Sequence, residues 1–224
     1  MVWALRCSWQ IGSAACDLYI QPMVSLRYSD SEFCELIHEC NNELSKAKGF
    51  YLVDSFGQMD SVMLTHKLDI ADQHVLPNMK IGFHAHNNRQ LAYSNALAFL
   101  EYNTKHDIML DSSIMGMGKG AGNLCTELIA SSLNQKGKDY KISCLYKSIS
   151  EYFSDVIKEH PWGYSLDYYL SSLYCCTPSY IKIFMRDERV TTDILIDLLR
   201  TIPEENRAAC NREFAISHLE AYFK

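Results

Sequence analysis

Two histidines separated by one residue are the side chains of this sequence best suited to chemistry. His84 and His86 lie in the apolar stretch IGFHAHNN. In a β-strand, residues i and i+2 project from the same face, so both imidazoles would point to one side. Two imidazoles on one face can share a divalent cation. Strands also carry hydrogen-bonded histidine pairs, so the spacing alone leaves both interpretations open.

A glycine-rich segment after the next apolar run favours a ligand site. The sequence DSSIMGMGKGAGN places four glycines in seven residues and ends at Asn123. Backbone amides in such a loop, ahead of a helix, favour an anion such as a carboxylate or an enolate. We predict Asn123 as an oxygen ligand and the backbone at Gly116, Gly118 and Gly120 as part of the substrate site. A tight turn with Asn123 as helix N-cap would explain one or two of these glycines, but not all.

Alternating strands and helices are predicted to position these segments. The expected strands are DLYIQPMVS, GFYLVDSFG, KIGFHAHNN and HDIMLDSSI. A capping-box pattern of Ser29 and Glu32 predicts a helix from about Asp30, and helical spacing recurs after each later strand. Strands this apolar are typical of a parallel sheet that is covered by helices. Two α/β arrangements fit, a doubly wound sheet and part of a (β/α)8 barrel.

Both arrangements place function at the carboxyl ends of the strands. Polar side chains occupy those positions in every expected strand: Ser25, Asp54, His84, His86, Asp111 and Ser112. After residue 139 the pattern becomes helical and is punctuated by three prolines. We therefore expect an α/β domain over residues 1–139 and a helical C-terminal subdomain over residues 140–224, in which the many tyrosines serve packing.

Composition excludes several classes of protein. The net charge of −6 does not indicate a protein that binds nucleic acid, which usually has a basic excess, and no 18-residue apolar run predicts a membrane span. Arg6, Ser8 and Gln10 interrupt the apolar N-terminus, which is unlike a signal peptide. Nine cysteines without a C-x-x-C pair indicate reduced thiols, so we expect a cytoplasmic protein that binds neither nucleic acid nor membrane.

Taken together, GFHAHNN and DSSIMGMGKGAGN resemble the motifs of the DRE-TIM metallolyase superfamily, the HMG-CoA lyase-like proteins. The order QPM, VDSFG, GFHAHNN and GMGKGAGN is most similar to 4-hydroxy-2-oxovalerate aldolase-like proteins. The resemblance covers residues 18–134, and WGYSLDYYLSS is similar to their helical tail. It implies a partial (β/α)8 TIM barrel, about strands 4 to 7 or 8, followed by helices.

The resemblance also implies a metal-dependent aldolase or lyase. His84 and His86 would bind Mn²⁺ or Mg²⁺ at the end of the sixth barrel strand, with Asn123 at or near the metal. The cation would hold a small 2-oxo acid or its enolate while a carbon–carbon bond is made or broken. Ser25 and Asp54 match strand ends that line the same mouth, where they would bind substrate.

One family feature has no counterpart here. The family's first strand ends in an Arg-Asp pair, whose Asp binds the metal, whereas only about sixteen residues precede the first expected strand of this chain. Arg186-Asp187 lies in the helical tail, where we expect a solvated turn. We expect an N-terminally truncated barrel whose first three βα units are either lost or supplied by another chain. The exposed sheet edges would then self-associate or be covered by the C-terminal helices.

Two alternatives to an active aldolase remain open. The chain could be a truncated or degenerate, non-catalytic homologue, because two imidazoles and an amide without a carboxylate bind Mg²⁺ poorly. It could also be an acyl-transferring synthase of the same superfamily. No catalytic acid or base is identifiable from the sequence.

Overall fold

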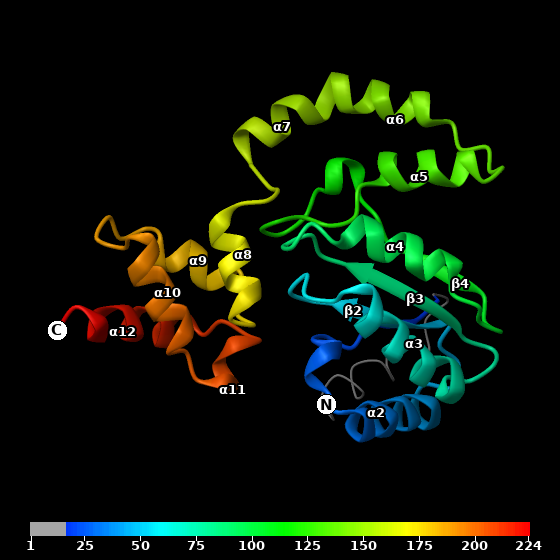
Figure 1. Ribbon diagram of the computed structural model, residues 1–224, viewed down its shortest axis with the longest axis horizontal. Coiled ribbons are helices and arrows are strands. Elements are labelled where there is room, and N and C mark those ends of the chain that lie inside the picture. Colours follow the sequence, from blue (N-terminus) through cyan, green and yellow to red (C-terminus); the bar gives the residue numbers. More distant parts are fainter. Residues whose placement is uncertain (1–16) are drawn as a thin grey trace. The chain divides into compact units, whose positions relative to one another are not determined.

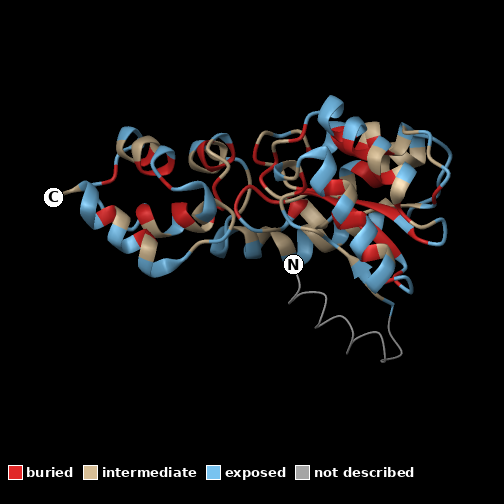
Figure 2. Ribbon diagram, turned by 90° about the horizontal axis from the view of Figure 1, so that it is seen from below, coloured by how far each residue is buried: buried red, intermediate tan, exposed pale blue. Residues whose placement is uncertain are grey.

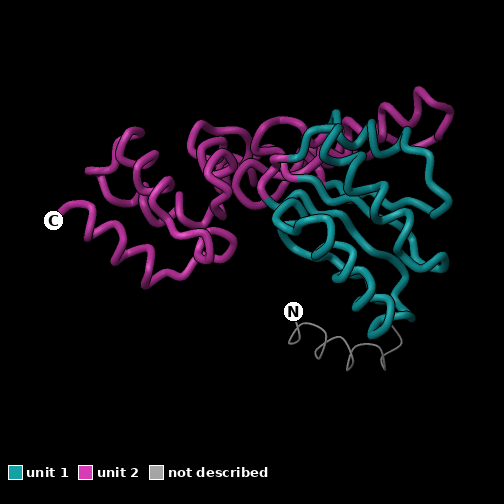
Figure 3. The backbone as a smooth tube through the Cα atoms, turned by 60° about the horizontal axis from the view of Figure 1, so that its bottom comes forward, with its two compact units in different colours: residues 1–55, 59–85, 93–112 teal, residues 56–58, 86–92, 113–224 magenta. Residues whose placement is uncertain are grey.

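The computed structural model describes residues 17–224, and the N-terminal stretch discussed above lies outside them (Figure 1). The chain forms two compact units (Figure 3). Within the described residues, the first comprises residues 17–55, 59–85 and 93–112, and the second comprises residues 56–58, 86–92 and 113–224. The predicted domain boundary at residue 139 is a separate division and stays a prediction. In residues 17–224 no helix is long and apolar enough to cross a membrane.

The first unit is built on a four-stranded parallel sheet. Its strands follow the chain in the order β1-β2-β3-β4, and every neighbouring pair is parallel. This order confirms the α/β class, and it is the order of a segment of a (β/α)8 barrel. The strands are β1 (Tyr19–Ile20), β2 (Gly49–Asp54), β3 (Lys80–Ala85) and β4 (Ile108–Leu110), and the helices with them are η1 (Ser25–Arg27), α2 (Asp30–Glu43), α3 (Ser61–His74) and α4 (Ala92–Glu101).

The two faces of this sheet carry different residues. On one face, Phe50 of β2 packs against Phe33 of α2 with ring centroids 6.0 Å apart, and Phe83 of β3 packs 5.6 Å from Phe99 of α4. The alternate residues of β2 and β3 face the other way, and Tyr51 is among them. Buried residues follow the strands and the inner helix faces (Figure 2).

Side-chain caps define where the helices begin. Ser29 and Glu32 form the expected capping box, because the Ser29 amide donates to Glu32 Oε2 at 2.8 Å and the Glu32 amide donates to Ser29 Oγ. Helix α2 therefore starts at Asp30, as predicted. Asp60 caps α3 in the same way by accepting from the Met63 amide at 2.8 Å.

The second unit is helical from residue 142 onward, which confirms the predicted helical tail. Its elements are η2 (Ile114–Gly116), α5 (Thr126–Gln135), α6 (Ile142–Ser148), the π-helical segment η3 (Ile149–Phe153), α7 (Ser154–Glu159), α8 (Leu166–Leu173), α9 (Ser179–Phe184), α10 (Thr192–Arg200), α11 (Glu204–Arg207) and α12 (Arg212–Tyr222). Arg186 and Asp187 lie in the turn after α9, as expected, and Asp187 is paired with Arg189.

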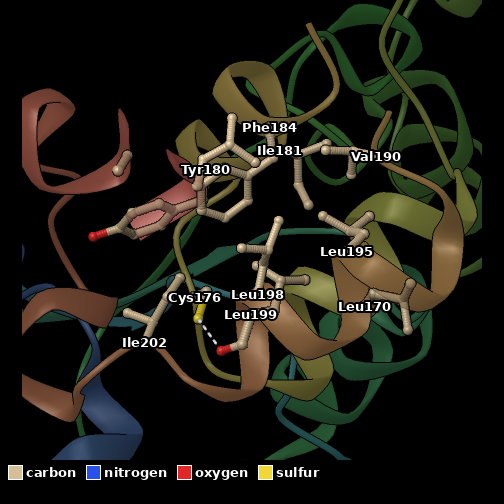
Figure 4. Close-up of a cluster of buried hydrophobic side chains, with 12 residues drawn as sticks. Leu170, Cys176, Tyr180, Ile181, Phe184, Val190, Leu195, Leu198, Leu199 and Ile202 are labelled. Atoms are coloured by element: carbon tan, nitrogen blue, oxygen red, sulfur yellow. Dashed lines mark hydrogen bonds between the residues drawn. The ribbon is translucent and has the colours of Figure 1, made fainter. Parts of the chain in front are cut away.

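Helices α8, α9, α10 and α12 enclose a hydrophobic core of their own. Tyr180, Phe184 and Leu198 are fully buried in it, and the Cys176 thiol donates to the Leu199 carbonyl (Figure 4). Packing thus accounts for Tyr180, in agreement with the expected role of the tyrosines. Tyr146 and Tyr152, on α6 and η3, are instead more than half exposed.

Candidate functional site

His84 is held by a carboxylate at the carboxyl end of the sheet. It is the penultimate residue of β3, and its Nδ1 lies 3.0 Å from Oδ2 of Asp111, the residue after β4. An ionised carboxylate only accepts hydrogen bonds, so Nδ1 carries the proton in the neutral ring. The lone pair able to bind a cation is then on Nε2. This is the arrangement in which a carboxylate orients a metal-binding histidine.

Tyr51 completes this group from the neighbouring strand. Its hydroxyl donates to Oδ1 of Asp111 at 3.0 Å, so both carboxylate oxygens of Asp111 accept a hydrogen bond. Burial, followed by the negative charge of Asp111, raises the pKa of Tyr51 well above its usual range. Tyr51 therefore stays a protonated donor across the physiological pH range.

His86 and Asn123 meet in the second unit. His86 directly follows β3 and forms an isolated antiparallel β-bridge with Asn123. The Asn123 Nδ2 donates to the Met117 carbonyl at 3.2 Å. Its Oδ1 is buried and has no hydrogen-bond partner among residues 17–224. A buried amide oxygen without a partner is rare in folded proteins, and it fits the predicted role of an oxygen ligand.

The glycine loop fits tightly around Asn123. Gly116, Gly120 and Gly122 have φ angles of 62°, 69° and 80°, which favour glycine. A Cβ on Gly118 would lie 2.6 Å from Asn123 Nδ2, and one on Gly122 would overlap the Gly116 carbonyl. Packing of the loop against itself therefore requires several of these glycines. Cys125 is the N-cap of α5, so Asn123 does not cap that helix.

Ser25 and Asp54 form hydrogen bonds that support the backbone. Ser25 is fully buried, and its Oγ accepts from the Val53 amide at 3.0 Å. Asp54 is 3% exposed, and its Oδ2 accepts from the Met59 amide at 3.1 Å. Their predicted contact with substrate stays a prediction.

The structure assembles the predicted residues into two groups. The first unit holds His84 with Asp111 and Tyr51, and the second holds His86 with Asn123 and the glycine loop. Sequence reasoning marked Asp111 as a polar residue at a strand end without giving it a role, and it missed Tyr51. No local sequence signal marks Tyr51, because its contact with Asp111 depends on strand register and on the absence of a side chain at its register partner Gly82.

The predicted ligands, His84, His86 and Asn123, have the chemistry to bind a divalent cation, but they are too few to complete its coordination. Two imidazoles and an amide oxygen are ligands that Mn²⁺ accepts more readily than Mg²⁺, which prefers charged oxygen. Within the described part of the chain, no group of three or more His, Cys, Asp or Glu side chains is arranged to hold a metal. A cation bound by these side chains would therefore need further oxygen ligands from a substrate, water or another polypeptide.

The sheet, with a histidine held at its carboxyl edge, defines a protein of the (β/α)-barrel class. A family model described as HMGL-like matches residues 6–151, which is well over half of the sequence. The chain belongs to the HMGL-like family.

Curated relatives match the sheet-bearing part of the chain. A 4-hydroxy-2-oxovalerate aldolase from Pelotomaculum thermopropionicum is 36% identical over 97 residues, which are 43% of this chain and 27% of that protein. Another from Geobacillus genomosp. 3 is 36% identical over 112 residues, 50% of this chain and 32% of that protein. The chain thus matches about a third or less of the length of these relatives.

Solved structures share the fold at low identity. The N-terminal domain of a proposed aldolase from Bacteroides vulgatus superposes with a TM-score of 0.72 and 23% identity, covering 87% of this chain and 62% of that one. The carboxyl transferase domain of Rhizobium etli pyruvate carboxylase gives 0.64 and 14%, covering 92% and 37%. An HMG-CoA lyase from Bacillus subtilis gives 0.54 and 17%, covering 69% and 52%. At these identities the likeness concerns the fold alone.

Proposed function

We propose that this chain is a divalent-metal-dependent lyase of the aldolase type, acting on 4-hydroxy-2-oxo acids. The observation that carries the proposal is the orientation of His84 by Asp111 at the end of β3, with His86 two residues further along the chain. The buried, unpartnered Oδ1 of Asn123 supports it. The names of the curated relatives point to the substrate class.

His84, His86 and Asn123 are the residues that would hold the cation, and Mn²⁺ suits them better than Mg²⁺. When bound, the cation supplies Lewis-acid stabilisation of the enolate of a 2-oxo acid. In the neutral ring of His84, the hydrogen bond from Nδ1 to Asp111 selects the tautomer that leaves the Nε2 lone pair free for the cation. The amides of the loop from Gly116 to Gly120 would favour the substrate carboxylate. The proposed reaction breaks the C3–C4 bond of 4-hydroxy-2-oxopentanoate to give pyruvate and acetaldehyde.

The test is turnover with Mn²⁺ and 4-hydroxy-2-oxopentanoate, read as the pyruvate released. We expect pyruvate from the unaltered chain, alone or with a polypeptide that supplies a carboxylate ligand, and none from His84→Ala or His86→Ala. His38→Ala is the matched control, because His38 lies on the exposed side of α2 and should leave turnover unchanged. No pyruvate under any of these conditions would contradict the proposal.

A non-catalytic homologue is the second candidate. The observation that favours it is the donor set, which contains no carboxylate ligand within residues 17–224. Such a protein would keep the fold but bind Mn²⁺ no better than its His84→Ala variant. A Mn²⁺ affinity that is measurably higher in the unaltered chain than in His84→Ala would argue against this candidate.

A further inference from the structure

Tyr51 crosses the sheet from β2 to the end of β4. Its register partner on β3 is Gly82, whose own partner on β4 is Met109. A Cβ on Gly82 would lie 2.5–2.6 Å from three atoms of the Tyr51 ring. The ring therefore occupies the space above β3 that any other residue at position 82 would fill. From there the Tyr51 hydroxyl reaches Asp111, two strands away from its own.

We propose that Tyr51 is a positioning residue that fixes the metal-binding nitrogen of His84 through Asp111. The inference rests on the proposed function, since it gives His84 the role of a ligand. Tyr51 touches neither substrate nor cation in this account. Its hydroxyl acts by restricting the carboxylate that orients the imidazole.

The Asp111 side chain has rotational freedom that a second hydrogen bond removes. Its side chain is 35% exposed at a strand end, so one hydrogen bond to His84 would leave the carboxylate able to turn toward water. The Tyr51 hydroxyl holds the other oxygen at 3.0 Å. Tyr51 itself is only 6% exposed and has Tyr19 packed edge-on at 6.4 Å. The buried Tyr51 thus restrains the partly exposed carboxylate of Asp111, which in turn fixes the tautomer and direction of His84.

A purely structural role for Tyr51 predicts different behaviour. If the ring only fills space above Gly82, Tyr51→Phe keeps that packing and changes neither the tautomer of His84 nor the metal affinity. If the hydroxyl positions His84, the same substitution alters both while the fold is retained. Tyr51→Phe therefore separates the two roles.

The chain offers a matched control in Tyr102. This tyrosine also donates to an aspartate of the first unit, Asp69, at 2.7 Å, but the pair involves no histidine. Tyr102→Phe consequently removes the same kind of hydrogen bond and should leave His84 unchanged. Gly82→Ala provides a second, independent disturbance, because its methyl group must displace the Tyr51 ring.

The experiment measures the His84 tautomer by long-range ¹H–¹⁵N NMR on the metal-free chain at a pH where the ring is neutral. Mn²⁺ affinity is then measured by calorimetry. We expect a single Nδ1–H tautomer in the unaltered chain and in Tyr102→Phe, and a mixture in Tyr51→Phe and Gly82→Ala. The affinity of Tyr51→Phe should fall about five- to tenfold, as expected for one lost hydrogen bond.

The two measurements distinguish failure of the positioning role of Tyr51 from failure of the proposed function. An unchanged tautomer in Tyr51→Phe, together with unchanged affinity wherever binding is measurable, would overturn the positioning role. Absence of Mn²⁺ binding in every variant would instead contradict the proposed function, while the metal-free tautomer still decides whether Tyr51 orients His84.

Discussion

Among single residues, Asp111 is the side chain that we expect to affect metal binding most after the two histidines. Asp111→Asn keeps the size of the side chain but offers either an amide donor or a weaker acceptor to His84. We expect Mn²⁺ affinity to fall by about 10- to 100-fold, the usual cost of losing the carboxylate behind a metal-binding histidine. Calorimetric titration of the two proteins measures this difference.

Asp107→Asn is the control for that substitution. Asp107 lies just before β4, at the opposite end of the strand from Asp111, and its side chain is exposed. It should bind Mn²⁺ as the unaltered chain does. Equal affinities of Asp111→Asn and the unaltered chain would show that the carboxylate has no part in binding.

The histidines could be identified from the sequence, but the residues that orient His84 through hydrogen bonds could not. The spacing of His84 and His86 is visible in the chain itself, because strand alternation is a local property. The link from Tyr51 to Asp111 depends on the register of three strands and on the missing side chain at Gly82. Register across strands is set by tertiary packing, so no local pattern reveals it.

At the level of the elements, Gly118 in the glycine loop and Gly137, which follows α5, are under different constraints that substitutions can separate. Gly118→Ala places a methyl group 2.6 Å from Asn123 Nδ2, so it should move the Asn123 side chain and weaken Mn²⁺ binding. Gly137→Ala introduces strain at a φ of 91° without any atom within 4 Å of the new Cβ. It should cost ~1 kcal/mol of unfolding free energy or more, with metal affinity unchanged.

Calorimetry and thermal unfolding of the two glycine variants distinguish these effects. The interpretation of Asn123 as a ligand fails if Gly118→Ala destabilises the chain while its affinity stays equal to that of Gly137→Ala.

The turn after α9 should stabilise the second unit in a pH-dependent way. Hydrogen bonds from Arg189 lower the pKa of Asp187 from 3.8 to about 2. Because the folded pKa is the lower one, this contribution is complete above the unfolded pKa and is lost as the pH falls from about 4 toward 2. The Tm difference between the unaltered chain and Asp187→Asn should therefore be largest near neutral pH and shrink through this window.

Asp139→Asn, in the connection before α6, serves as the comparison for Asp187→Asn. A Tm difference for Asp187→Asn that stays constant from pH 7 to pH 2.5 would contradict the proposed pairing with Arg189.

Element boundaries were predictable where local chemistry fixes them. The capping box places the start of α2 at Asp30, as the sequence indicates. The strands are shorter than their apolar runs, since β1 has two residues and β4 has three. A strand ends where its backbone stops pairing with the neighbouring strand, and apolar content does not reveal that point. The π-helical turn of η3 has no recognised sequence signal and was not predicted.

At the scale of the whole molecule, the order of strands and helices was readable from the sequence. Four apolar runs separated by helical spacing predict a parallel sheet, and the structure confirms it. The division into units was not readable, because residues 56–58 and 86–92 belong to the second unit although they follow strands of the first. Such an assignment depends on contacts between distant segments.

The sheet edges lead to a prediction about association. Strands β1 and β4 are the edges of the four-stranded sheet of the first unit. Unpaired edges of parallel strands favour pairing with another chain, although the shortness of both strands limits it. We expect self-association in light scattering after size exclusion, with a mass above the 25.7 kDa of one chain. A mass of one chain at all concentrations would contradict this expectation.

The central claim is that His84 and His86 bind a divalent cation in an HMGL-like chain. The most direct measurement is a calorimetric titration with Mn²⁺, with and without oxalate as a mimic of the pyruvate enolate. We expect saturable 1:1 binding that oxalate strengthens and that His84→Ala and His86→Ala each abolish, while His38→Ala binds normally. Binding that survives both substitutions, or no binding with oxalate present, would contradict it.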